Sequence, residues 1–525
     1  MHLQQQTDQG QEKQFFIQDT VLRMMILAFL FLLAFNMRLY HLDDPPLEYH
    51  PSRQYHSAII ARAYYYDTLG AVPQWKREIA NLNRKKEGLL EPPVTELLAA
   101  FIYRIAGGER LWIPRLFSSL FWLIGGAFLY RIAKRLVSTD AAVFSTAYYL
   151  FVPYGVLASR SFQPEPLMTM MVLMSILTIL RYNDKPSIAR LAVIVTVTAA
   201  ALLVKPQCAI QIFVLFISIE ISKKGFIRAF LNRDAALYFV ISLLPVLAYY
   251  IYGVFISGSL QGRAEGRFIF HVLLSGFFWS GWLSRAEIVF GPMGIIGALL
   301  GLTLASGRLQ KTVIAGLLAS YLIFGIIFSY SIHTHDYYHL QYIPMVALCL
   351  GPLADSFLSR FNAPEFRFKL RRAAVICIFV IVIIASMRET YPRLLNQSAD
   401  NVVSTCRIVG QLVNHSRRTI FLTWGYGAPL EYHGEISGRW WPAYDDFNWE
   451  KLKGLPELSA EQRFNKIYLG DSPEYFIITD SGEFRKQSDL RDFLAKNFAI
   501  LAKTNSFLIF DLKKKPDREN FLQNQ

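Results

Sequence analysis

Long apolar runs separated by short polar connections form the main pattern of this chain from residue 21 to residue 388. An apolar run of roughly 20 residues can cross a bilayer as a helix, so the pattern predicts about eleven membrane spans. The expected spans are residues 21–40, 112–133, 141–157, 166–180, 191–204, 207–222, 235–256, 291–306, 312–331, 340–358 and 373–388. The chain is therefore expected to be a polytopic α-helical membrane protein with a separate C-terminal segment.

The C-terminal segment has the alternating pattern of a small soluble domain. Residues 419–424, 475–479 and 507–512 are predicted strands, and residues 488–496 are a predicted helix. We thus expect a mixed α/β domain at 391–525, after a membrane domain at 21–390 and an N-terminal segment at 1–20. Two connections inside the membrane domain are long, at 41–111 and 257–290.

Composition supports the membrane class, because the 525 residues are 53% hydrophobic and only 18% charged, against about 25% charged in soluble domains. The first span keeps Arg23 at its start and lacks a small-residue cleavage site, which predicts an uncleaved anchor. Of the four cysteines only Cys406 lies outside the spans, so no disulfide framework is indicated.

Basic residues gather in alternate connections between the spans, and this bias sets the orientation. The basic residues concerned are Arg131, Lys134, Arg135, Arg181, Lys185, Arg190, Lys223, Lys224, Arg228, Arg233, Arg308, Lys311, Arg360, Arg367, Lys369, Arg371 and Arg372. The positive-inside rule puts these loops and the N-terminus in the cytoplasm. An odd number of spans then places 41–111, 257–290 and the tail outside. The net charge of +14 is thereby explained without a nucleic-acid partner.

Under this topology, polar side chains from several loops collect at the outer membrane boundary. They are Glu48, His50, Arg53, His56, Glu91, Arg160, Glu165, Lys205, His333, His335 and Asp336. Ionisable groups beside a bilayer are costly to keep and are functional-site candidates for that reason.

The first loop offers a carboxylate and an arginine near a predicted helix at 57–66. Glu48 could act as a general base, or could favour the helix start through the helix dipole. His50, Arg53 and His56 are spaced by three residues and would share one helix face. Arg53 could grip a phosphate or form a structural ion pair with Glu48.

The other loops each allow a functional and a structural interpretation. Glu91 precedes two prolines and a predicted helix at 94–105, so it is either catalytic or a helix-start carboxylate. Arg160 and Glu165 flank a bend with two prolines, and an internal salt bridge between them is the alternative to a substrate role. Lys205 could snorkel to the interface or bind a lipid phosphate.

Two further segments remain open. His333, His335 and Asp336 invite a metal interpretation, but their spacing matches no standard zinc site, and hydrogen bonds to a polar substrate are favoured. A divalent cation is the less favoured option, and no cofactor is expected. The aromatic segment at 257–290 is either a lid over a site or an interfacial helix.

At these residues the sequence resembles the GT-C glycosyltransferases of the dolichyl-phosphate-mannose–protein mannosyltransferase type, in their bacterial branch, which includes the aminoarabinose transferases acting on lipid A. The similar motifs are Glu48, His50-Pro-Ser-Arg53-Gln54, Ala58-Ile-Ile-Ala61-Arg62, Glu91-Pro-Pro, Arg115-Leu, Gln163-Pro-Glu165, Lys205-Pro and His335-Asp336-Tyr337-Tyr338. The family carries aspartate where this chain has Glu48, and commonly where it has Glu165.

The resemblance implies a GT-C-like fold and an inverting glycosyltransferase. Its donor would be a sugar on a polyprenyl phosphate, and its acceptor a glycolipid, another glycan or a protein. Glu48 would deprotonate the acceptor, with Glu91 and Glu165 as alternatives, while Arg53, Lys205 and Arg160 would hold the phosphate. His50, Gln54, His56 and the segment His335-Asp336-Tyr337-Tyr338 would contact substrate. The expected location is the bacterial inner membrane, with the site facing the periplasm.

A transporter or flippase of a polar lipid is the competing class. It also needs many spans and buried charge. It does not need a long polar outer loop together with an outer soluble domain, and the sequence lacks an internal repeat.

Overall fold

The computed structural model describes residues 20–89, 91–258, 260, 270–359, 366–395, 399–452 and 454–516. The chain divides into two compact units. The first unit comprises Met1–Leu42, Leu90–Pro92 and Arg115–Leu395, and the second comprises Asp43–Leu89, Pro93–Pro114 and Asn396–Gln525. The expected N-terminal segment lies almost entirely outside the described residues.

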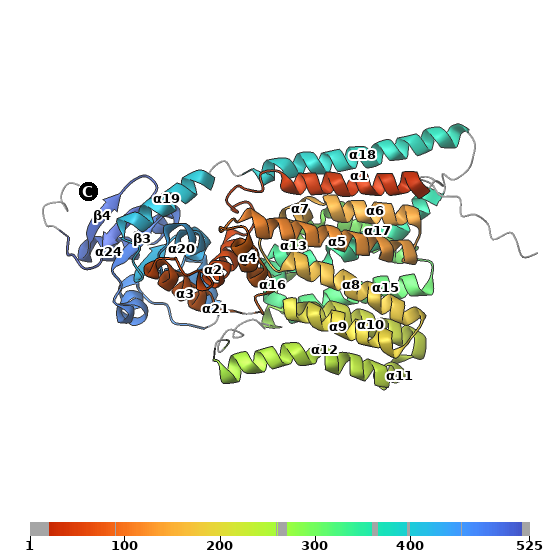
Figure 1. The fold of residues 1–525 in the computed structure, drawn as a ribbon, viewed down its shortest axis with the longest axis horizontal. Coiled ribbons are helices and arrows are strands. Elements are labelled where there is room, and N and C mark those ends of the chain that lie inside the picture. Colours follow the sequence, from red (N-terminus) through yellow and green to blue (C-terminus); the bar gives the residue numbers. More distant parts are fainter. Residues whose placement is uncertain are drawn as a thin grey trace, which may run out of the picture. The chain divides into compact units, whose positions relative to one another are not determined.

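The first unit is a bundle of long helices that run roughly side by side (Figure 1). Its helices are α1 (Thr20–Leu39), α5 (Trp112–Leu136), α6 (Thr139–Phe151), α7 (Pro153–Ser159), α8 (Glu165–Asp184), α9 (Ile188–Val204), η1 (Pro206–Cys208), α10 (Ala209–Lys224), α11 (Phe226–Phe230), α12 (Arg233–Ile251), η2 (Tyr252–Ile256), η3 (Phe270–Leu274), α13 (Gly276–Phe290), α14 (Pro292–Leu304), α15 (Arg308–Ile327), α16 (Ser329–Thr334), η4 (Asp336–Tyr342), α17 (Ile343–Leu358) and α18 (Phe366–Leu394). Neighbouring pairs such as α8 with α9 and α10 with α15 pack together.

Every expected span overlaps helices of this bundle, although the one at 141–157 is divided between α6 and α7. The chain is therefore a multi-pass membrane protein. Within the described residues, seven helices are long and apolar enough to cross a membrane, or up to nine if each of two bent pairs is one span. Helix α9 is apolar but shorter. Eleven spans therefore stay a prediction.

The two bent pairs have local causes in the sequence. Helices α6 and α7 meet at 62°, where Pro153 follows Val152, whose extended backbone (φ −55°, ψ 125°) ends the first helix. Helices α13 and α14 meet at 96°, where Gly291 adopts φ 71° before Pro292. Residues 259 and 261–269 of the expected aromatic loop lie outside the described part of the chain. Its described remainder includes helix α13.

The second unit combines the first long connection with the C-terminal segment. The connection forms α2 (Pro51–Asp67), α3 (Gln74–Glu87) and α4 (Val94–Ile105). Helix α2 packs on both of its neighbours. Helix α3 is missing from the sequence interpretation because its only buried residues are Ile79, Ala80 and Asn83, too few to make an apolar period visible.

The C-terminal segment is a mixed five-stranded sheet with helices on both faces. Its elements are α19 (Ala399–Leu412), β1 (Thr419–Leu422), η6 (Trp424–Gly427), α20 (Ala428–Gly434), β2 (Gly438–Trp440), α21 (Tyr444–Leu452), α22 (Ala460–Arg463), η7 (Phe464–Tyr468), η8 (Leu469–Asp471), β3 (Tyr475–Ile478), α23 (Ser481–Lys486), α24 (Ser488–Asn497), β4 (Ala499–Lys503) and β5 (Leu508–Asp511). The predicted mixed α/β domain is confirmed, as are its three predicted strands and its helix.

The sheet order is β2-β1-β3-β5-β4. Strands β2, β1 and β3 are parallel, whereas β5 is antiparallel to β3 and β4. Alternate residues of a strand face opposite sides, so Ile420 and Phe476 enter one core with α24, while Phe421 and Ile477 enter the other with α19.

Candidate active site

A buried lysine lies between two glutamates in the first unit. Lys205 follows the last turn of α9, and Pro206 then ends the apolar run because it cannot continue the helix. The Lys205 Nζ atom is 2.5 Å from Glu165 Oε1 and 3.9 Å from Glu91 Oε1. The side chains are 8% exposed for Lys205, 1% for Glu165 and 26% for Glu91.

The two carboxylates differ in what they can do. Glu165 opens α8 after Pro164, a position that the helix dipole favours for an anion, and its buried carboxylate fixes the direction of Lys205. Glu91 lies before α4, whose first residue is Val94, so the predicted helix at 94–105 is confirmed with Glu91 outside it. Its more open carboxylate is the one that a substrate could reach.

The bend that carries Glu165 also presents an amide, that of Gln163, which the sequence interpretation placed in a motif without giving it a role. Gln163 is 1% exposed, and its Nε2 atom has no hydrogen-bond partner among the residues that the structure describes. A buried donor without an acceptor is costly and suits an incoming phosphate or sugar oxygen. The feature of the sequence that could have marked Gln163 is its position next to Pro164 and two residues before Glu165.

Three fully buried arginines fix the surroundings of this bend. Arg160 donates from Nη1 to the carbonyl of Tyr40 at 2.6 Å and from Nη2 to that of His41 at 2.7 Å. Arg115 donates to the carbonyl of Leu42 at 2.6 Å and to that of Arg160 at 3.3 Å. Arg38 bonds the Ser159 hydroxyl at 2.7 Å. Arg160 was predicted to bind a phosphate. In the structure both of its terminal nitrogens donate to backbone carbonyl groups instead.

The predicted residues at 335–338 lie where α16 passes into η4. His335 Nδ1 is 2.6 Å from the Thr334 hydroxyl, and its ring lies edge-on to Tyr337. Asp336 opens η4, and Tyr338 packs near Phe324 and Phe328. No group of three or more His, Cys, Asp or Glu side chains is arranged to hold a metal ion in the described part of the chain.

The predicted residues of the first loop lie in the second unit, at the start of α2. His50 caps this helix in a left-handed conformation (φ 39°), with Pro51 in the first turn and Glu48 just before it. Because His50 lies outside the helix, only Arg53 and His56 share the predicted helical face. Gln54 is fully buried and donates to the carbonyl of Tyr49 at 2.7 Å.

Some ionisable residues of α2 form ion pairs within the second unit. His56 Nδ1 is 2.6 Å from Glu87 Oε2. Arg62 donates from Nε to both oxygens of Glu109 at 3.0 Å and stacks on the Tyr432 ring at 3.5 Å. The structure therefore brings Glu91 and Glu165 together around Lys205 in the first unit, and it places the predicted residues of the first loop at the start of α2 in the second unit. The predicted residues 335–338 lie apart from both groups in sequence, at the junction of α16 and η4.

A second buried lysine–glutamate pair was not predicted. Lys86 on α3 is 2.5 Å from Glu431 on α20, whose side chain is fully buried. Burial raises the pKa of Glu431 to about 7, although the charge of Lys86 pulls it down. Glu431, Arg62 and Lys76 line one small cavity with Asn83 and Glu435. The tail sequence gives no motif that marks Glu431.

The helical bundle and the mixed C-terminal domain form a multi-pass membrane protein with the GT-C glycosyltransferase fold, as the resemblance predicted. Residues 90–252 match the model of the dolichyl-phosphate-mannose-protein mannosyltransferase family. No curated protein matches the sequence.

Solved structures of low sequence identity resemble the chain over most of its length. ArnT from Cupriavidus metallidurans, in the apo state and bound to undecaprenyl phosphate, is 15% identical, with 93% of this chain and 97% of that chain covered and a TM-score of 0.56. The Archaeoglobus fulgidus oligosaccharyltransferase tethered with an acceptor peptide is 11% identical, with 92% and 73% covered and a TM-score of 0.52. These likenesses establish the fold.

Proposed function

We propose that this protein is an integral-membrane glycosyltransferase that moves a sugar from a polyprenyl-phosphate donor to an acceptor on the outer face of the membrane. One observation carries the proposal: Lys205, at the end of the apolar helix α9, is buried between Glu165 and Glu91. A lysine in such a place is expensive unless it meets a fixed or incoming negative charge.

Lys205 would stabilise the leaving group. When the bond from the sugar anomeric carbon to the phosphate oxygen breaks, the electron pair goes to the phosphate, and a preorganised cation lowers the energy of that charge. Glu165 would act as a positioning residue for Lys205. Gln163 Nε2, buried two residues away in the sequence, would donate to a phosphate or sugar oxygen.

The acceptor oxygen would attack the same carbon from the opposite side, and a carboxylate would take its proton. Glu48, next to His50, is the base that the resemblance favours, and Glu91 is the more open carboxylate beside Lys205. The engagement of Glu165 with Lys205 argues against Glu165 as the base. The fold of ArnT, solved with undecaprenyl phosphate, supports undecaprenyl phosphate as the donor lipid. We also propose that the protein lies in the bacterial inner membrane with its active site facing the periplasm.

The test compares Glu48→Gln, Glu91→Gln and Glu165→Gln in the purified full chain, reconstituted in lipid with undecaprenyl-phosphate sugar and envelope acceptor. Sugar transfer and undecaprenyl phosphate binding are measured separately. We expect the variant of the true base to lose transfer by ~10³-fold, in the range of a lost general base, while binding persists. Full transfer by all three variants would remove these carboxylates as the base, and no transfer by the unaltered chain would overturn the proposal. Movement of the donor across the bilayer without transfer would identify a flippase.

A further inference from the structure

Large aromatic side chains are exposed at one edge of the sheet in the second unit. Trp424 and Tyr426 follow β1 and are 51% and 57% exposed, and Tyr444 follows β2 and is 53% exposed. The Tyr426 ring meets the Trp440 ring edge-on at 5.4 Å. Trp424, Tyr426, Trp440 and Tyr444, here called the aromatic edge, lie at the carboxyl ends of parallel strands, where sheets of this kind bind ligands.

The backbone after β1 is held in an unusual conformation that displays two of these rings. Gly425, Tyr426 and Gly427 have φ values of 66°, 55° and 88° in succession. Tyrosine adopts that region only at a cost, and such strain is typical of functional segments. A Cβ on Gly427 would lie 2.1 Å from the Phe421 ring, so the close approach of this turn to the core requires glycine.

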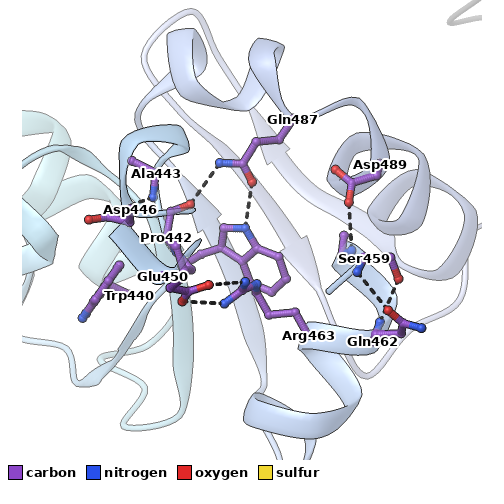
Figure 2. A network of polar contacts seen from close by, with 12 residues as sticks. Trp440, Pro442, Ala443, Asp446, Glu450, Ser459, Gln462, Arg463, Gln487 and Asp489 are labelled. Carbon is purple, nitrogen blue, oxygen red and sulfur yellow. Dashed lines mark hydrogen bonds and ion pairs between the residues drawn. The ribbon is translucent and has the colours of Figure 1, made fainter. Parts of the chain in front are cut away.

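The loop after β2 is rigid for a different reason. Gln487 donates to the carbonyl of Pro442 at 3.0 Å, and Asp446 accepts from the backbone N–H of Ala443 at 2.9 Å (Figure 2). Glu483 accepts from the N–H of Tyr444 at 2.8 Å. A surface fixed in this way loses little conformational entropy when it binds.

The chemistry around the rings selects a carbohydrate over a lipid surface. Aromatic faces pack against the C–H faces of sugars, and carboxylates accept hydrogen bonds from hydroxyl groups. Asp445 and Asp446 begin α21, and Asp480 and Glu483 belong to the start of α23. Exposed Trp and Tyr also favour membrane interfaces, but these carboxylates would be repelled by an anionic lipid surface.

We infer that the aromatic edge binds the carbohydrate part of the acceptor, so that the acceptor is a glycan or glycolipid. The inference rests on the proposed function. Segment η6 packs against α2, and a Cβ built on Gly425 would lie 3.9 Å from the backbone nitrogen of Ser52. The aromatic edge therefore adjoins the helix start that carries His50 and Arg53. An acceptor chain stacked there would extend toward the residues of the first loop.

The experiment measures glycan binding apart from catalysis. The full chain in zwitterionic nanodiscs is applied to immobilised oligosaccharides, namely lipopolysaccharide core saccharides and hexasaccharides of glucose and mannose. We expect binding to at least one class, weakened at least tenfold in the double variant Trp424→Ala, Tyr426→Ala. Leu469→Ala is the matched control, since Leu469 is 53% exposed before the amino end of β3. The control variant should bind like the unaltered chain.

Two further measurements separate the possible failures. Undecaprenyl phosphate binding should be equal in all variants, which shows that they fold and that the donor site is independent of the aromatic edge. Unchanged glycan binding by the double variant, or no binding by the unaltered chain, would overturn the inference and leave the proposed function standing. Binding to anionic vesicles is measured in the same variants. If the double variant loses vesicle binding and keeps glycan binding, the aromatic edge contacts a membrane surface, and the inference is overturned. Glycan binding without any sugar transfer would instead remove the proposed function.

Discussion

Two lysine–glutamate pairs in this molecule have the same length and different surroundings. Lys205 and Glu165 in the first unit and Lys86 and Glu431 in the second unit are each 2.5 Å apart, with a carboxylate that water hardly reaches. Lys205 is itself buried and meets a second carboxylate, whereas the Lys86 side chain is 27% exposed. Buried ion pairs are weak evidence of stability, so the surroundings of the lysine distinguish a reactive pair from a structural one.

The largest expected effect comes from Lys205→Met. If Lys205 stabilises the leaving phosphate, its loss should reduce transfer by roughly 10²- to 10³-fold, the range for a removed oxyanion-stabilising group. The measurement is the initial rate of polyprenyl phosphate release by the reconstituted protein, normalised to folded protein.

Lys224→Met is the matched control for that variant. Lys224 pairs with Glu220 at 2.6 Å at the end of α10, and its side chain is 41% exposed. Its removal should leave the rate of transfer per folded protein within about twofold, because Glu220, 5% exposed, still accepts a hydrogen bond from Asn232 at 3.0 Å. Equal losses in both variants would mean that Lys205 acts through bundle stability and has no separate role in the reaction.

A smaller effect, confined to stability, is expected from Lys86→Met. The variant leaves Glu431 buried without its cation, and breaking a buried pair costs about 3–5 kcal/mol. Because the pKa of Glu431 is already raised to about 7, protonation should relieve part of this cost below neutral pH. Limited proteolysis of the C-terminal segment in the full chain would report the loss.

The double variant Lys86→Met, Glu431→Met sharpens the comparison. Replacing both partners of a buried pair by apolar groups is often neutral or stabilising, so proteolytic resistance should return. A double variant as weak as the single one would show that Glu431 has further partners on which α20 depends.

The sequence marked both residues of the first pair as candidates without pairing them, and it marked neither residue of the second pair. The reasons are physical. Lysine before proline interrupts an apolar run, and Glu165 stands between two prolines, so both residues break a strong local pattern. The sequence did not show which side chain would contact Glu165, since a salt bridge between Arg160 and Glu165 was an equal alternative. Lys86 and Glu431 are 345 residues apart, and both belong to helices without a membrane pattern.

The same contrast holds for the fold. Apolar runs predicted the membrane helices and three of the strands, because burial of a span or of a central strand needs a continuous apolar stretch. The polar helix α3 and the short strand β2, with residues Gly438–Trp440, escaped because tertiary packing determines them. The pairing of the first loop with the tail in one unit likewise depends on contacts between segments far apart in the chain.

The smallest expected effect is a pH dependence that separates two neighbouring groups on α20. Burial raises the pKa of Glu431 to about 7 and lowers the pKa of His433 to about 3. The folded state thus holds the Glu431 proton more tightly than the unfolded chain, and this contribution to stability falls as pH rises from about 5 to 7. His433 stays neutral when folded, so its contribution falls as pH drops below about 6.5.

Because the two contributions oppose each other between about pH 5 and 6.5, the unaltered chain should show a shallow dependence of melting temperature on pH. Glu431→Gln removes one contribution and should expose the other, so that the variant loses stability steadily on acidification. Each pKa unit corresponds to about 1.4 kcal/mol, which makes the difference between the two chains at most about 2 kcal/mol across this range. If the melting temperatures of the unaltered chain and of Glu431→Gln change in parallel from pH 5 to 8, Glu431 has an ordinary pKa. Lys86–Glu431 would then be an ordinary ion pair, distinguished from Lys205–Glu165 by the greater exposure of its lysine.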